Sequence, residues 1–346
     1  MNLDKSETAE RADAARVLPA SPYPEPAPEL FHVHKQNLLR QIDQQTRSVV
    51  PQRGRRRRRA ALVVASAAVA CVAVVVTGLS ITSTEPPSKT PPASKASIQL
   101  LEQAALAAAA DPGAVPRSGQ YTYVKVTGHT MALSERKDGS MERLRQDESY
   151  EQWTSVDGSG RTMQRKPGGS ASWLPTGEPG EGSLNLPTYR FLAGLPTEPG
   201  ALLKTIYRDA NLNHGAGSGS TTGPDQESFV TIGDLLRASV APPDVSAALF
   251  RAAARIPGVI VVQDAVDAAG RHGVAVAREH DGERLEWIFD KDTKELLGER
   301  TVLVEDNAWG KAGTPVTSTA VIQSGIVDKA GQEPAHGSGQ GSHSAA

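Results

Sequence analysis

The sequence has a single cysteine, and it lacks the motifs that usually mark metal centres and nucleophilic catalytic sites. It has one cysteine, Cys71, so no intramolecular disulfide can form and the fold must depend on its core. The eight histidines include no HExxH motif and have no cysteine pairs beside them, so we expect no metal and no cofactor. A GxSxG motif is also absent, and carboxylates such as Asp290 and Asp292 occur where turns are expected. We therefore predict a protein that is not an enzyme.

The longest uncharged stretch of the chain, 60–84, contains the apolar run from Ala60 to Thr82. As a helix with about 1.5 Å of rise per residue it would be roughly 34 Å long, enough to cross a hydrocarbon core of about 30 Å. A cleaved signal peptide is less favoured, because 59 residues precede the run. A lipoprotein signal at Cys71 is less favoured too, because the apolar stretch VAVVV follows it. We predict one transmembrane helix over 60–82.

A cluster of arginines lies directly on the N-terminal side of this run. By the positive-inside rule, these residues place the N-terminus in the cytoplasm and the long C-terminal part outside the cell membrane. Basic charge can also bind nucleic acid, but the position of the cluster beside a membrane span favours a role in topology, and we expect no nucleic-acid partner. The predicted topology-determining residues are Arg53, Arg55, Arg56, Arg57, Arg58 and Arg59.

Proline content and hydrophobic periodicity divide the chain into five parts. A cytoplasmic segment, mostly disordered, contains one predicted helix near 29–50, which could lie on anionic lipid or bind a partner. Four prolines mark a linker before the extracytoplasmic domain, and a tail rich in glycine and serine is disordered by composition. The predicted parts are 1–59 cytoplasmic, 60–82 transmembrane, 83–96 linker, 97–328 extracytoplasmic domain and 329–346 tail.

The clearest pattern in the extracytoplasmic part is a run of four strands with short turns over 259–305, with a fifth strand over 314–327. Leu285, Trp287 and Phe289 alternate, so they are predicted to face the helices, whereas Glu286 and Ile288 face away and Glu286 is solvated. Together with earlier strands and helices this predicts an α+β domain, an antiparallel sheet with helices on one face. Such a sheet could curve into an open half-barrel with an apolar concavity for a lipid or peptide.

Five segments of the chain resemble a known group of proteins: LPTEP (195–199), DLLR (234–237), AALFRAAARIPGV (247–259), GRHGVAVAR (270–278) and IFDKDTKELLGER (288–300). This set resembles an uncharacterised family of single-pass membrane proteins from high-GC Gram-positive bacteria, often encoded beside extracytoplasmic-function sigma factors. Its outer domain is remotely similar to the lipoprotein-carrier and sigma-regulatory periplasmic fold. The resemblance carries over no catalytic residue.

The resemblance implies a role in envelope signalling with a cytoplasmic regulatory partner such as a sigma factor. The chain departs from an anti-sigma protein because its cytoplasmic part is short, has one predicted helix and contains no cysteine. Two functions therefore stay open. One is a regulatory membrane protein whose outer domain binds a ligand or protein partner. The other is a tethered lipid or lipoprotein carrier without a signalling role, in which residues 1–59 only anchor the domain.

Overall fold

The computed structural model describes residues 90–335, except 112, 137, 139, 175–181 and 215–221. The described residues belong to one compact unit, 83–346. The predicted membrane span, the helix near 29–50 and the arginine cluster at 53 and 55–59 lie outside the described residues. Within the described part of the chain, no helix is long and apolar enough to cross a membrane.

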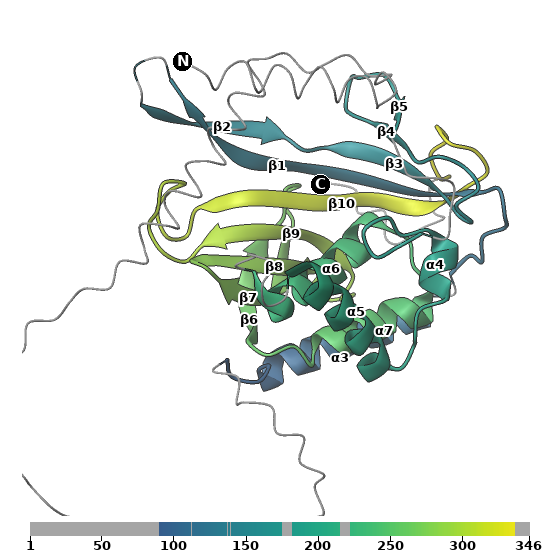
Figure 1. Ribbon diagram of the computed structural model, residues 1–346, viewed down its shortest axis with the longest axis horizontal. Helices are drawn as coiled ribbons and strands as arrows, with labels where there is room; N and C mark the ends of the chain where they lie inside the picture. Colours follow the sequence, from purple (N-terminus) through teal and green to yellow (C-terminus); the bar gives the residue numbers. More distant parts are fainter. Residues whose placement is uncertain are drawn as a thin grey trace, which may run out of the picture. The chain divides into compact units, whose positions relative to one another are not determined.

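Ten strands form one antiparallel sheet (Figure 1). Nine of them follow the order β5-β4-β3-β1-β10-β9-β8-β7-β6, and β2 pairs with the C-terminal half of β1, residues 129–135. The large antiparallel sheet with helices confirms the predicted α+β class. The strands are β1 Tyr121–Glu135, β2 Met141–Asp147, β3 Tyr150–Ser155, β4 Met163–Arg165, β5 Ser172–Trp173, β6 Val259–Val266, β7 His272–His280, β8 Glu283–Phe289, β9 Leu296–Leu303 and β10 Pro315–Val327.

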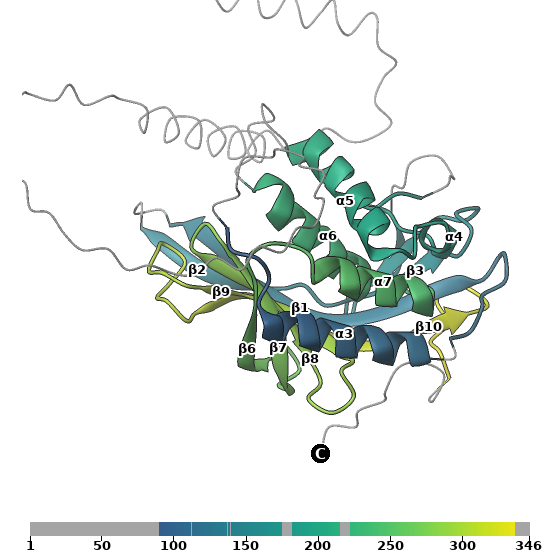
Figure 2. The same ribbon diagram turned by 90° about the horizontal axis from the view of Figure 1, so that it is seen from below.

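Helices α5, α6 and α7 are seen together on one side of the strands in Figure 2, and all five helices share a core with β6–β8. We call the side of the sheet that they cover the helix face and the other side the back face. Ser94 caps α3 by accepting a hydrogen bond from Ser97 N at 3.1 Å, so this helix begins inside the segment predicted as linker. The helices are α3 Lys95–Ala110, α4 Tyr189–Ala193, α5 Pro199–His214, α6 Gly223–Ala238 and α7 Pro243–Ala253.

The predicted alternation along β8 is confirmed on the helix face. Leu285, Trp287 and Phe289 are all buried in the core that joins the sheet to the helices. Trp287 stacks on Phe229 of α6 with ring centroids 4.0 Å apart. Phe289 meets Phe250 of α7 edge-on at 5.6 Å. These aromatic pairs fix the helices against the sheet.

The expectation that Glu286 is solvated is wrong. Glu286 does face away from the helices, but it is fully buried on the back face. Its carboxylate accepts hydrogen bonds from Arg284 Nε at 2.8 Å and from Arg300 Nε at 2.7 Å. The alternation of apolar and polar residues indicated which side is the core. This alternation could not show that arginines from β8 and β9 would bind the Glu286 carboxylate and cover it from solvent.

Strand β10 joins the two halves of the sheet, because it pairs with β9 on one side and with β1 on the other. Beyond β10, residues 328–335 cross the back face and cover a small cluster around Tyr123 and Trp153. Trp153 Nε1 donates a hydrogen bond to the Gln332 carbonyl at 2.5 Å. The packed structure therefore continues to residue 335, past the predicted domain end at 328, and the first part of the predicted tail is ordered.

Candidate ligand-binding cavity

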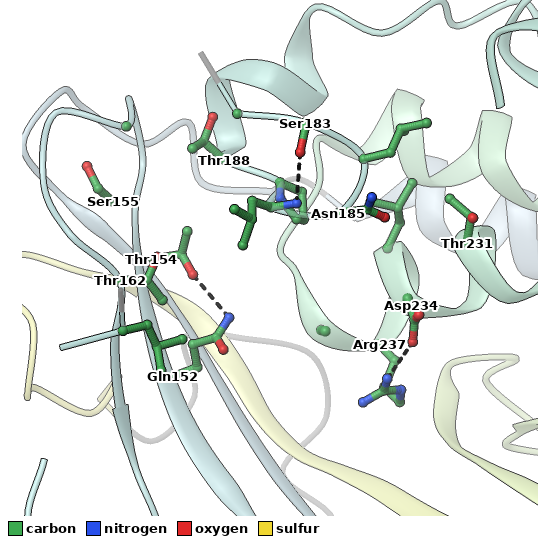
Figure 3. A pocket seen from close by; sticks show the side chains of 18 of the residues that line it. Gln152, Thr154, Ser155, Thr162, Ser183, Asn185, Thr188, Thr231, Asp234 and Arg237 are labelled. Carbon is green, nitrogen blue, oxygen red and sulfur yellow. Dashed lines mark hydrogen bonds and ion pairs between the residues drawn. The ribbon is translucent and has the colours of Figure 1, made fainter. Parts of the chain in front are cut away.

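A cavity of about 540 Å³ opens between β3 and α6 on the helix face (Figure 3). This volume is within the usual range of small-molecule sites, roughly 300–1,000 Å³. Its walls come mainly from three parts of the chain that are distant in sequence: β3 with the turn after it, the segment 182–188, and α6. Leu174, directly after β5, adds a further lining residue. The lining residues are Gln152, Thr154, Ser155, Gly158, Gly160, Thr162, Leu174, Gly182, Ser183, Leu184, Asn185, Leu186, Pro187, Thr188, Glu227, Thr231, Asp234, Leu235, Arg237 and Ala238.

Helix α6 presents one side to the cavity and another to the core. Glu227, Thr231, Asp234 and Ala238 line the cavity and follow one another at spacings of three or four residues, which places them on one side of a helix. Phe229 on the core side is fully buried against the sheet. The same helix therefore forms a wall of the cavity and a part of the hydrophobic core.

Strand β3 supplies the opposite wall through its alternation. Trp153 points to the back face, so Gln152 and Thr154 on either side of it point into the cavity (Figure 3). Gln152 Nε2 donates a hydrogen bond to Thr154 Oγ1 at 3.2 Å. This places a carboxamide and a hydroxyl side by side at the cavity wall.

The segment 182–188 is held in place by its own hydroxyl groups. Ser183 Oγ accepts a hydrogen bond from Leu186 N at 3.1 Å. Thr188 Oγ1 caps α4 by accepting from Phe191 N at 3.1 Å. Leu184 and Leu186 from this segment add apolar surface to the same cavity. The cavity is thus lined by apolar and polar groups together, whereas the sequence suggested an apolar concavity.

The charged groups at the end of α6 compensate one another. Arg237 donates from Nη2 to Asp234 Oδ1 at 2.5 Å and from Nη1 to the Tyr150 hydroxyl at 3.4 Å. Burial disfavours the charge on Arg237, but the nearby Glu299, Tyr150 and Asp234 outweigh that effect and raise its pKa. The guanidinium group is therefore held in the charged form by groups that belong to the protein itself.

Glu299 of β9 adds a carboxyl group near Arg237 and Asp234 from the side of the sheet. It pairs in register with Trp287, so it lies on the helix face. Burial raises the pKa of Glu299 to about 7, although Arg237 acts in the opposite direction; Asp234 adds to the increase. This carboxyl group changes charge near neutral pH, close to the guanidinium group that lines the cavity.

None of the described lining residues was singled out from the sequence as a site residue. The predicted topology arginines lie outside the described residues. Within the part of the chain that the structure describes, no group of three or more His, Cys, Asp or Glu residues could hold a metal ion. The cavity itself was missed, although one signal was present: Glu227, Thr231 and Asp234 form a polar stripe along a helix whose other side is apolar.

The described unit is thus an α+β domain with one large antiparallel sheet and a cavity of ligand size on its helix face. No protein-family description and no curated protein matches the chain.

Proposed function

We propose that this protein is a single-pass protein of the cell membrane whose extracytoplasmic domain binds a ligand in the cavity between β3 and α6. The cavity of about 540 Å³ is the observation that carries the proposal. The uncharged run 60–82 and the arginines before it support an N-terminus in the cytoplasm and a C-terminus outside the cell.

The proposed role is regulatory, in envelope signalling. Residues 1–59 would bind a cytoplasmic partner, such as a sigma factor, through the predicted helix at 29–50. The resemblance to membrane proteins encoded beside sigma factors supports this role. The position of α6 also supports this role, because the helix lines the cavity and packs in the core. A ligand that contacts Thr231 or Asp234 would act on the same helix whose Phe229 stacks on Trp287. A ligand can shift such an element only if it prefers one of two arrangements.

The alternative function is a tethered carrier of a lipid or lipoprotein. The apolar part of the cavity favours it, since Leu174, Leu184, Leu186 and Pro187 all line one site. In this alternative the sheet acts as an open half-barrel that shelters an acyl chain, and the cytoplasmic segment has no function beyond anchoring.

The test compares two changes made in the gene at its own locus. One replaces residues 29–50 by a flexible sequence of the same length, and the other is Thr154→Phe, which fills the cavity from β3. For the regulatory role we expect both changes to alter the transcription of the same genes. We also expect residues 1–59 to capture a cytosolic protein that is lost when the helix is replaced. Thr317→Phe is the matched control, because Thr317 is a half-buried threonine on β10 outside the cavity lining.

The outcomes separate the two functions. A phenotype from Thr154→Phe together with a harmless replacement of 29–50 would favour the carrier. If Thr154→Phe behaves like Thr317→Phe in every assay, the cavity has no role and the ligand-binding proposal is wrong.

A further inference from the structure

The charged groups of the cavity already interact with other groups of the protein, and of the three nitrogens of the Arg237 guanidinium group only Nε has no hydrogen-bond partner. Glu227, Asp234 and Arg237 are the ionisable residues of the described lining. Arg237 binds Asp234 and Tyr150 and lies near Glu299, and Glu227 also has a partner. A charged ligand would have to lose its hydration and break one of these pairs to gain an opposite charge. The lining therefore favours a ligand that is neutral where it enters the cavity.

The remaining polar groups of the lining are neutral and can both donate and accept hydrogen bonds. Gln152 and Asn185 carry carboxamides on two different walls (Figure 3). Gln152 donates one amide hydrogen to Thr154 Oγ1 at 3.2 Å and accepts one hydrogen bond from Gln164 Nε2 at 3.5 Å, which leaves it one further hydrogen and one further lone pair. Hydroxyl groups accompany them on β3 and α6, at Thr154 and Thr231. A carboxamide has an acceptor oxygen and donor hydrogens in one plane, and the group that matches it most directly is another amide.

The apolar part of the lining limits the chemical class of the ligand further. It consists of leucine, proline and alanine side chains, and the described lining contains no aromatic ring. Aromatic rings are the usual platform for the C–H faces of sugars, so this composition fits aliphatic groups better than a sugar face. The apolar groups Leu184 and Leu186 lie on the same short segment as Asn185, which places amide recognition and aliphatic contacts within one wall.

We infer that the cavity binds a neutral peptide segment with small aliphatic side chains, whose backbone amides are recognised by Gln152 and Asn185. This inference rests on the proposed ligand-binding function and specifies its ligand. An uncapped chain end, with its ammonium or carboxylate group, would have to compete with the interactions that Asp234 and Arg237 already make with each other, so the site is expected to accept the interior of a peptide in preference to its ends.

The experiment uses the full chain in lipid nanodiscs and four probes observed by saturation-transfer NMR. The probes are N-acetyl-trialanine amide, which is neutral; the same peptide with a free carboxylate; trialanine amide with a free ammonium group; and the neutral sugar triacetylchitotriose. We expect the capped peptide to bind most tightly and each charged form to bind several-fold more weakly. Gln152→Leu should weaken binding of the capped peptide by about tenfold, since it removes a hydrogen-bonding partner of the amide.

Two variants link any binding to this cavity. Thr154→Phe should abolish the signal of the capped peptide, and Thr317→Phe should leave it unchanged. The inference is overturned if a charged peptide or the sugar binds as tightly as the capped peptide, if Thr154→Phe leaves binding intact, or if the capped peptide does not bind at millimolar concentration. The genetic test with Thr154→Phe does not depend on these probes, so the proposed function can stand when the peptide inference fails.

Discussion

Trp287 and Glu286 are neighbours in β8 whose side chains are both buried, one on each face of the sheet. Trp287→Ala removes the ring stacked on Phe229 and should destabilise the domain by about 3–5 kcal/mol. Glu286→Ala leaves Arg284 and Arg300 without their shared carboxylate. The side chains of Arg284 and Arg300 are 24% and 18% exposed to solvent. We therefore expect the free energy of unfolding to fall by about 2–3 kcal/mol, less than for a fully buried ion pair.

Urea unfolding of residues 83–346, which form one compact unit, measures both effects. Glu286→Gln is the matched control, because it keeps the shape of the side chain and removes its charge. A loss below about 0.5 kcal/mol for Glu286→Ala, the size expected of a solvated residue, would contradict the buried ion pairs described here.

Glu299 should make the stability of the domain depend on pH. Burial raises its pKa from 4.5 to about 7, while Arg237 opposes and Asp234 adds to the increase. Between these values the folded state binds more protons than the unfolded state, so stability falls as pH rises through this window, by at most on the order of 3 kcal/mol. Glu299→Gln should remove this contribution.

The measurement is the free energy of unfolding at pH 5 and at pH 8. The stability of Glu299→Gln, measured relative to that of the unaltered protein at the same pH, should be greater at pH 8 than at pH 5. Glu148→Gln, at an exposed position, serves as the control. An unchanged difference between the two pH values would show that Glu299 does not titrate in this range.

At the scale of elements, the contact between α6 and the sheet depends on Gly233. A Cβ atom at this position would lie 2.5 Å from Trp287 Nε1 and 2.9 Å from Glu299 Oε2. An alanine in a helix normally gains about 1 kcal/mol over glycine. Here the clash should reverse the sign, and we expect Gly233→Ala to cost about 1–3 kcal/mol as α6 moves away from β8 and β9.

Calorimetric melting of Gly233→Ala, Trp287→Phe and the double variant tests this contact. The smaller ring leaves room for the added methyl group, so the cost of Gly233→Ala should be lower in the Trp287→Phe background. Additive effects would mean that the methyl group and the indole do not compete for the same space.

The segment after β10 should act as a cover for the back face. Ending the chain at residue 327 removes the hydrogen bond from Trp153 to Gln332 and the ion pair of Arg165 with Glu333. It also exposes the indole of Trp153, which is fully buried in the intact chain. We expect a lower melting temperature and a red shift of tryptophan emission.

A chain that ends at residue 335 is the control, since it keeps every described contact of the cover. If the shorter chain melts at the same temperature as the control, residues 328–335 contribute nothing to stability, and the tail would begin where the sequence placed it.

The elements that the sequence predicted well are those specified by local patterns. The strands of 259–305 follow a period of two and are separated by turns such as Asp281–Gly282, so β6 to β9 appear as expected. The pairing of β1 with β10 has no local signal, because the strands are separated by most of the domain. The cavity is missed for the same reason, since its walls are distant in sequence and meet only after folding.

At the scale of the whole domain, the linker and the cavity meet opposite parts of the sheet. The chain enters beside β6: Gly258 N donates to the Pro91 carbonyl at 2.7 Å, and Ser94 N donates to the Val259 carbonyl at 2.9 Å. Strand β6 is one edge of the sheet, whereas β3, which lines the cavity, lies near the other edge. We expect coupling between ligand and linker to pass through the core shared by α6, α3 and β6–β8, because α6 lines the cavity and α3 follows the linker.

The proposed topology gives the last prediction. Protease added to intact protoplasts should remove the extracytoplasmic domain and leave a small N-terminal fragment, because in the proposed topology the arginines before residue 60 keep residues 1–59 in the cytoplasm. Permeabilised protoplasts, in which that fragment is also degraded, are the control.

Replacing Arg53 and Arg55–Arg59 by glutamine should weaken this orientation and protect a part of the outer domain. Release of a domain that begins near residue 71 or 83 without added protease would instead indicate a cleaved signal. The chain would then have no anchor through which residues 1–59 could report the occupancy of the cavity.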